Sequence, residues 1–193
     1  GAALALGVAA WPLIWHWSSL AGARWSAAAL WAVVAAGWGL LLLQRLRPRF
    51  GRRTAAPPIA PVSRGPLLAT YVLLSGVLLL ALAARFVAAR DLAFPPWVDS
   101  SRHALITAVM VERGRTLTDY APYLPVDRFP YHFGFHTLSA ALVLMTGAPL
   151  PELLLFLMQL LGGLLPLPVY AAGWLVTRRR SVGIGPASST GSP

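Results

Sequence analysis

Carboxylates and imidazoles are concentrated in one stretch of a chain that is otherwise strongly apolar. Five of the 6 acidic side chains and three of the 4 histidines fall between residues 91 and 136. These are the side chains that general acid–base catalysis uses. Because ionisable side chains are costly near a bilayer, a cluster of them between apolar segments is a candidate functional site. A solvent-exposed loop is also rich in charged residues simply because they are well solvated there. The alternative that this cluster is an ordinary solvated loop stays open.

Asp99 is the acid that we single out for chemistry. It follows the rigid corner Phe94-Pro-Pro-Trp97 and precedes a segment that reads as a helix over residues 101–113. A carboxylate at the amino end of a helix is favoured by the helix dipole and by the free backbone N–H groups. Two interpretations follow: Asp99 caps the helix, or it is a general base that faces a substrate at the membrane surface.

The histidines are spaced in a way that could place them on common helix faces. Asp99, His103 and Thr107 are each four residues apart, and His132 and His136 repeat this spacing. Histidines at positions i and i+4 can share a metal ion. The pair Asp99 and His103 and the pair His132 and His136 are therefore the candidate ligands of a divalent metal ion. The second pair encloses no glutamate that could serve as the base of a zinc protease. The sequence identifies no particular cofactor, and a divalent metal ion is the candidate.

Cationic and aromatic side chains accompany the acids. The guanidinium of Arg102 could hold the phosphate of a lipid carrier by paired hydrogen bonds, with His103, Tyr131 and His132 as further substrate contacts. The alternative is that the aromatic rings anchor the loop at headgroup depth. Arg113 and Arg115, beside Gly114, are interpreted as solvated charges.

The composition places these residues in a membrane protein. The chain is 57% hydrophobic and 11% charged, and its mean hydropathy is +0.64. A helix needs about 20 apolar residues to cross the hydrocarbon core. The apolar stretches cover residues 1–23, 26–43, 66–84 and 153–177, with a shorter one at 133–151. The sequence therefore predicts an all-α, polytopic membrane protein with about five membrane helices and an interfacial helix in an external loop. The absence of cysteine excludes disulfides and a cysteine nucleophile.

Charge predicts the topology. The formal net charge of +10 comes from 16 arginines, many of them beside apolar stretches, where basic residues set orientation and contact anionic headgroups. Nucleic acid is therefore not a predicted partner. The predicted parts are a two-helix hairpin (1–43), a basic cytoplasmic linker (44–65), a membrane segment (66–180) with an external loop (88–132), and a flexible tail (181–193). Residues 133–149 either cross the membrane or form a re-entrant hairpin, which would keep the arginines at 178–180 inside.

The polar stretch resembles the amino-terminal part of GT-C membrane glycosyltransferases, in the dolichyl-phosphate-mannose and aminoarabinose transferase-like branch. The letters PPWVDSSRH, then YAPYLP and FPYHFGFH, carry the resemblance, which covers about residues 66–180. By position Asp99 matches the catalytic aspartate of that family, and Phe129-Pro-Tyr-His132 matches its aromatic entry to the next span. The sequence departs from the family in having Ser100 instead of a second acid, two extra spans before residue 66, and no later spans.

The resemblance implies a fragment of an integral membrane glycosyltransferase of a prokaryotic plasma membrane. Such an enzyme moves a sugar from a polyprenyl-phosphate carrier to an acceptor at the extracytoplasmic face, and its partners are membrane lipid and the lipid-linked sugar. We expect the fragment itself to be inactive. The alternative is a non-enzymatic polytopic membrane protein, a transporter or scaffold subunit. Transporters carry ionisable groups inside their spans, whereas His16 is the titratable group that we place within an apolar stretch here.

Overall fold

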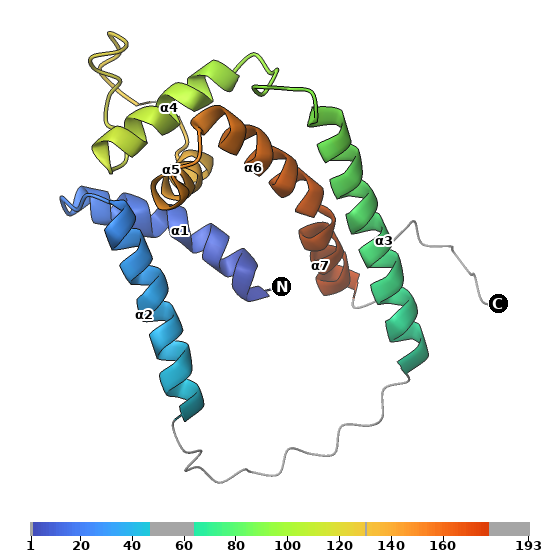
Figure 1. Ribbon diagram of the computed structural model, residues 1–193. Coiled ribbons are helices and arrows are strands. Elements are labelled where there is room, and N and C mark those ends of the chain that lie inside the picture. The colour runs from blue at the N-terminus through green and yellow to red at the C-terminus, as the bar shows by residue number, and fades with distance from the viewer. Residues whose placement is uncertain (1, 47–63, 130, 178–193) are drawn as a thin grey trace. The chain divides into compact units, whose positions relative to one another are not determined.

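The computed structural model describes residues 2–46, 64–129 and 131–177, and every regular element in these ranges is a helix. The helices are α1 (Ala2–Leu20), α2 (Ala27–Leu46), α3 (Arg64–Ala89), α4 (Ser100–Arg113), α5 (Gly134–Thr146), α6 (Leu150–Leu164) and α7 (Pro166–Thr177) (Figure 1). The all-α class predicted from the sequence is confirmed. The predicted linker at 44–65 and tail at 181–193 fall largely or wholly outside the described residues.

Three helical stretches of the described chain are long and apolar enough to cross a membrane. They are Ala27–Leu46, Leu68–Ala89 and Leu150–Val176, the last of which combines α6 and α7. This confirms a membrane protein, with fewer spans than the five that the sequence predicts. The difference lies in α1, whose second half carries tryptophans, serines and His16, and in α5. With 13 residues, α5 is about 20 Å long, which is short of the roughly 30 Å hydrocarbon core.

The described helices belong to two compact units. Within the described residues, the first unit joins residues 2–46 with 92–129 and 131–157, and the second joins residues 64–91 with 158–177. In the first unit α5 packs against α1, α2 and α4 (Figure 1). The polar stretch thus shares one unit with the amino-terminal helices α1 and α2.

Small residues on α5 let the helices of the first unit approach closely. Ala140 and Ala141 are buried on α5, where they meet a core to which α1, α2 and α4 contribute. The largest side chains of that core are those of Trp15, Leu30, Ile106, Met110 and Tyr120. Small residues are the usual means by which helices pack in membrane proteins.

Tryptophans tie α1 to the start of α2 and to α5. The rings of Trp11, Trp15 and Trp25 contact one another, with centroids 5.1 to 5.8 Å apart. The indole N–H of Trp25 donates to the Ser18 hydroxyl over 2.9 Å, and that of Trp11 donates to the Thr137 carbonyl over 3.3 Å. These hydrogen bonds satisfy the indole N–H groups of Trp11 and Trp25 while the rings fill the core, whereas the buried indole nitrogen of Trp15 has no partner among the described residues.

Gly114 ends α4, as the sequence predicts, and also joins it to the turn before α2. Its φ of 62° lies in the left-handed region, and its N–H donates to the Met110 carbonyl over 2.8 Å. Its own carbonyl accepts the Trp25 N–H at 2.6 Å. A Cβ at this position would collide with the backbone carbonyl oxygen of Trp25. Both the dihedral angle and the close approach therefore require glycine.

In the second unit α3 packs against α7 (Figure 1). The helix breaks at Leu165, between α6 and α7. Gly162-Gly163 and the two prolines Pro166 and Pro168 predict a kink in this segment from the sequence alone, and the break confirms it. Pro166 and Pro168 have no N–H to continue the α6 hydrogen bonds, which is the cause of the break. Gly163 lies against the side chain of Leu82 on α3.

We expect alanine at Gly114 to destabilise the protein more than alanine at Gly147. Gly147 has a similar φ of 67° and ends α5, but no atom lies within 4 Å of the position that an alanine methyl group would take there. Its substitution should cost about 1 kcal/mol for the left-handed backbone alone. Gly114→Ala should cost at least about 2 kcal/mol, because the Trp25 backbone bond must also open. Denaturant unfolding in micelles measures the free energy of unfolding of both variants. Equal losses of stability would mean that the contact with Trp25 contributes nothing.

Candidate functional site

Asp99 occupies the capping position of α4 without capping it. Its φ and ψ are −87° and 1°, and its side chain makes no hydrogen bond to the helix end. Its backbone carbonyl accepts the His103 N–H over 2.9 Å, which begins the helix. The side chain is exposed. Of the two interpretations that the sequence leaves open, side-chain capping is therefore not observed, and the carboxylate remains accessible.

Two predicted site residues meet between α4 and α5. Nδ1 of His103 lies 2.8 Å from Nε2 of His136, and the two rings stack with centroids 5.0 Å apart. His136 is fully buried, whereas His103 is half-buried. The other ring nitrogen of His136, Nδ1, lies 3.1 Å from the backbone carbonyl oxygen of His132. Both nitrogens of the buried ring are thus hydrogen-bonded.

The two hydrogen bonds determine where the protons lie. A carbonyl oxygen only accepts, so Nδ1 of His136 carries the proton, and Nε2 of the neutral ring is an acceptor. Nδ1 of His103 must then donate to it. Nε2 of His103 is left with a lone pair, and it can take up a proton without breaking either bond. His136 holds the orientation and tautomer of His103, which is the group of the pair able to exchange protons.

Burial keeps His136 neutral. The pKa of His136 is lowered from 6.5 to about 4, chiefly by loss of solvation and in smaller part by the neighbouring side chains of His103 and His132. The hydrogen bond to the His132 carbonyl acts in the opposite direction. His136 lies near the start of α5, outside the three membrane-spanning stretches. The ring is therefore neutral at physiological pH, as the assigned hydrogen bonds require.

Aromatic rings surround the half-buried His103. Tyr131 approaches it edge-on with a centroid distance of 5.7 Å, and Phe135 does so at 5.9 Å. Tyr131 also stacks on the exposed His132 at 4.3 Å. The structure therefore brings Tyr131, His103 and His136 together and adds Phe135, which the sequence analysis missed. The sequence signal that could have identified Phe135 is its position in the FGFH segment, after Gly134 and directly before His136.

The candidate metal ligands do not assemble into a metal site. No group of three His, Asp or Glu side chains in the described ranges is close enough to hold an ion. His103 and His136 bond directly to each other, and the second nitrogen of His136 bonds to the His132 carbonyl. His136 thus has no free lone pair for a metal. The i, i+4 spacing of His132 and His136 instead produces a backbone contact.

The polar residues Arg102 and Thr107 of α4 lie in different environments, one exposed and the other buried. Thr107, four residues after His103, is fully buried, and its hydroxyl has no hydrogen-bond partner among the described residues. Arg102 is exposed. Its positive charge opposes the effect of burial, which raises the pKa of Tyr120. Arg102 therefore acts electrostatically on the loop side of α4, and its predicted role as a phosphate ligand stays a prediction.

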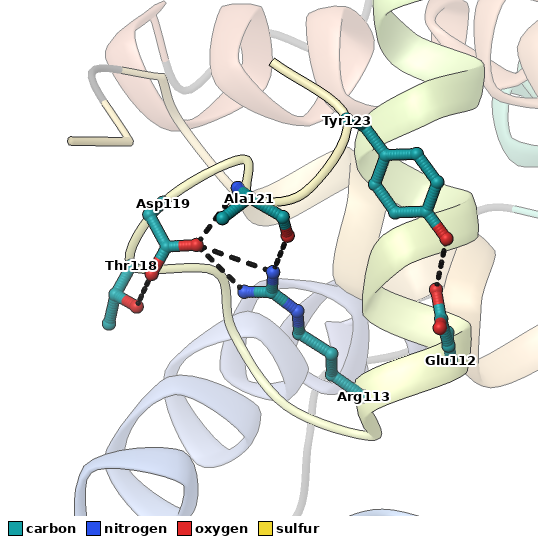
Figure 2. Close-up of polar contacts among 6 residues, drawn as sticks. All are labelled: Glu112, Arg113, Thr118, Asp119, Ala121 and Tyr123. Carbon is teal, nitrogen blue, oxygen red and sulfur yellow. Dashed lines mark hydrogen bonds and ion pairs between the residues drawn. The ribbon is translucent and has the colours of Figure 1, made fainter. Parts of the chain in front are cut away.

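A second polar cluster attaches the loop after α4 to the end of that helix (Figure 2). Nη1 and Nη2 of Arg113 lie 3.2 and 3.3 Å from Oδ1 of Asp119, and Nη2 also donates to the Ala121 carbonyl. Asp119 accepts the Ala121 N–H over 3.1 Å and the Thr118 hydroxyl over 2.9 Å. The interpretation of Arg113 as a solvated charge is therefore wrong, because the loop folds back over it.

These contacts shift the titration of the loop residues. The Thr118 hydroxyl is the largest cause that lowers the pKa of Asp119, with the Ala121 amide and Arg113 adding to it against the opposing effect of burial. Tyr123 donates its hydroxyl to Glu112 over 2.8 Å (Figure 2), and this bond raises the pKa of Tyr123. Asp119 is thus held as a carboxylate, the form that accepts these hydrogen bonds.

We expect stability to fall as the pH is lowered from 6.5 toward 4. The folded-state pKa of His136 is depressed, so the unfolded chain binds the proton more readily in this window. The stabilisation is complete above pH 6.5, and about 3 kcal/mol of it is lost by pH 4. Unfolding free energies measured across this range check the slope. His136→Gln should flatten the slope. His132→Gln, at an exposed ring that makes the smallest contribution to the shift, should change it little. A slope that survives in His136→Gln would contradict the assignment.

Asp119→Ala should release the loop over residues 115–129. The Ala121 amide then loses its carboxylate acceptor, so its hydrogen exchange should become faster in the variant. Amide exchange read by mass spectrometry on peptides that cover the loop measures this. Asp127→Ala, at an exposed carboxylate of the same loop, is the matched control. Equal exchange in the two variants would show that the Asp119 contacts do not hold the loop.

No protein-family model matches this chain, and neither a curated protein nor a solved structure is significantly similar to it. The interpretation of its function therefore depends on the residues and on the geometry described above. The resemblance to GT-C glycosyltransferases stays a prediction from sequence motifs.

Proposed function

We propose that this chain forms part of an integral membrane glycosyltransferase of the GT-C type. It would move a sugar from a polyprenyl-phosphate carrier to an acceptor at the extracytoplasmic face of a prokaryotic plasma membrane. The observation that carries the proposal is the carboxylate of Asp99, which is exposed at the start of α4 and is not hydrogen-bonded to the helix. A general base must be free to reach the proton that it removes, and the exposed carboxylate of Asp99 meets this condition.

In the proposed reaction Asp99 accepts the proton of the acceptor hydroxyl. The hydroxyl oxygen forms a bond to the anomeric carbon of the sugar as the bond from that carbon to the carrier phosphate breaks. The carrier leaves as polyprenyl phosphate, and no oxidant or reductant is needed. Positioning of the two substrates and stabilisation of the departing phosphate supply most of the rate acceleration in such a step.

The neighbouring side chains suit the other requirements of this reaction. Arg102 is exposed three residues after Asp99, and a guanidinium can bind the departing phosphate through paired hydrogen bonds. His103 follows one turn after Asp99, with its Nε2 lone pair directed by His136 as a second proton acceptor. Tyr131 and His132 present stacked rings, and aromatic faces are common platforms for sugars.

The proposed topology places these residues outside the cytoplasm. Because α5 is too short to span, we propose that residues 133–149 are re-entrant, which keeps the arginines at 178–180 on the cytoplasmic side. The basic segment at 44–65 is then cytoplasmic as well. The loop at 88–132 lies at the opposite face, where lipid-linked sugars are used.

Asp99→Asn in the full-length membrane protein should abolish sugar transfer while leaving membrane insertion intact. Loss of a general base typically lowers the rate by about 10² to 10⁴-fold. Transfer of a labelled sugar from a polyprenyl-phosphate donor in isolated membranes measures it. Asp127→Asn, which removes an exposed carboxylate from the same loop, should retain near-normal transfer. Near-normal transfer by Asp99→Asn would exclude Asp99 as the base.

A further inference from the structure

Arg85 places a charge inside a membrane-spanning helix. The described span Leu68–Ala89 of α3 contains one charged residue, Arg85, and its other residues are uncharged. The apolar stretch predicted from the sequence ends at residue 84 and does not include Arg85. A charged side chain within a span is costly, and it is normally retained where it has a partner of opposite charge or lines a binding site.

A groove opens on the second unit beside this arginine. It has a volume of about 370 Å³ and is lined by Leu74, Val77 and Ala81 of α3 and by residues at the junction of α6 and α7, such as Gly162, Pro166 and Val169. All of these lining residues are apolar. The groove would be a good site for hydrocarbon and a poor one for a polar ligand.

The guanidinium of Arg85 contacts Gly162, which is one of the residues that line this groove. A Cβ at Gly162 would collide with the guanidinium atoms, so the side chain of Arg85 rests directly against this glycine. Leu74, Val77, Ala81 and Arg85 follow one another at steps of three or four residues, which places them on one face of α3. The apolar groove and the positive charge are therefore parts of one surface.

The described part of this unit offers Arg85 no carboxylate. The one acidic residue in the described part of the second unit is Asp91, and its carboxylate pairs with the guanidinium of Arg90 over 3.1 Å. The alternative partner within the chain is the end of α6, where Pro168 has no N–H to donate to the Leu164 carbonyl oxygen. A carbonyl oxygen at the end of α6 would explain why a positive charge is retained at Arg85. It would not explain the apolar groove beside Arg85.

We propose that the groove binds one chain of an anionic phospholipid, whose phosphate pairs with Arg85. Leu74 and Arg85 are eleven residues apart, so the surface extends for about 16 Å along α3. This length matches one leaflet of a bilayer, which is about 15 Å of hydrocarbon. An amphiphile with a negative headgroup and an acyl chain is complementary to both the charge and the apolar lining. The inference is independent of the proposed sugar transfer.

Lipid binding by the purified, delipidated full chain tests this directly. The chain in micelles is titrated with phosphatidylglycerol or with phosphatidylcholine, and bound lipids are counted by native mass spectrometry. A basic residue near the membrane surface contributes about 1 kcal/mol toward an anionic headgroup, so phosphatidylglycerol should bind about fivefold more tightly. Arg85→Gln should remove this preference. Arg90→Gln removes the same charge five residues later and should keep it.

A second pair of variants tests the groove without altering charge. Val77→Phe narrows the groove and should weaken binding of both lipids, whereas Val87→Phe, at an exposed position of α3 outside the groove, should not. The proposal is wrong if the two lipids bind equally to the unaltered chain, or if Arg90→Gln loses as much preference as Arg85→Gln. It is also wrong if Arg85→Gln lowers thermal stability equally in both lipids without changing their binding, because Arg85 would then serve only the end of α6.

Discussion

The burial of His136 between α4 and α5 is the interaction on which the geometry of the polar stretch depends. A buried polar group left without a partner costs about 1 to 3 kcal/mol, so both ring nitrogens must be hydrogen-bonded. The His132 carbonyl satisfies one of them and His103 satisfies the other. One of these partners belongs to the chain that enters α5 and the other to α4. The same pair of bonds therefore fixes the start of α5, the rotation of α4 about its axis and the position of Asp99 one turn before His103.

The opposite end of α4 is fixed by contacts of a different kind. Gly114 bonds to the backbone of Trp25, and Arg113 binds Asp119 in the loop that follows. The loop is thus held near its start, while residues 121–128 remain exposed. A rigid helix with a solvent-facing carboxylate at its beginning and a tethered loop at its end provides fixed groups beside an accessible surface. Catalytic and binding sites are commonly built in this way, on loops positioned by a rigid scaffold.

Local physical chemistry accounts for what the sequence predicted correctly. The helical class, the limits of α4 with its glycine end, and the break at Pro166 and Pro168 all follow from hydropathy and backbone preferences of nearby residues. The partner of His136 lies 33 residues away on another helix, and no spacing within one segment could reveal it. The same reason explains the error over Arg113, whose partner depends on how the loop folds back. The predicted span count was too high for two reasons. The second half of α1 carries tryptophans, serines and His16, and the apolar stretch at 133–151 includes Gly147 and prolines, where the chain turns and shortens α5.

The hydrogen-bonded histidines change which chemistry suits this surface. A metal-dependent mechanism needs free lone pairs directed at one point, and the buried ring of His136 uses both of its nitrogens for other bonds. What remains accessible on this face of α4 is a carboxylate, at Asp99, and the outer nitrogen of His103. Both groups can accept a proton. Transfer of a sugar from a phosphate carrier needs the removal of one proton and a cation beside the leaving phosphate. The exposed side chains of Asp99 and Arg102, three residues apart on α4, are groups of those two kinds.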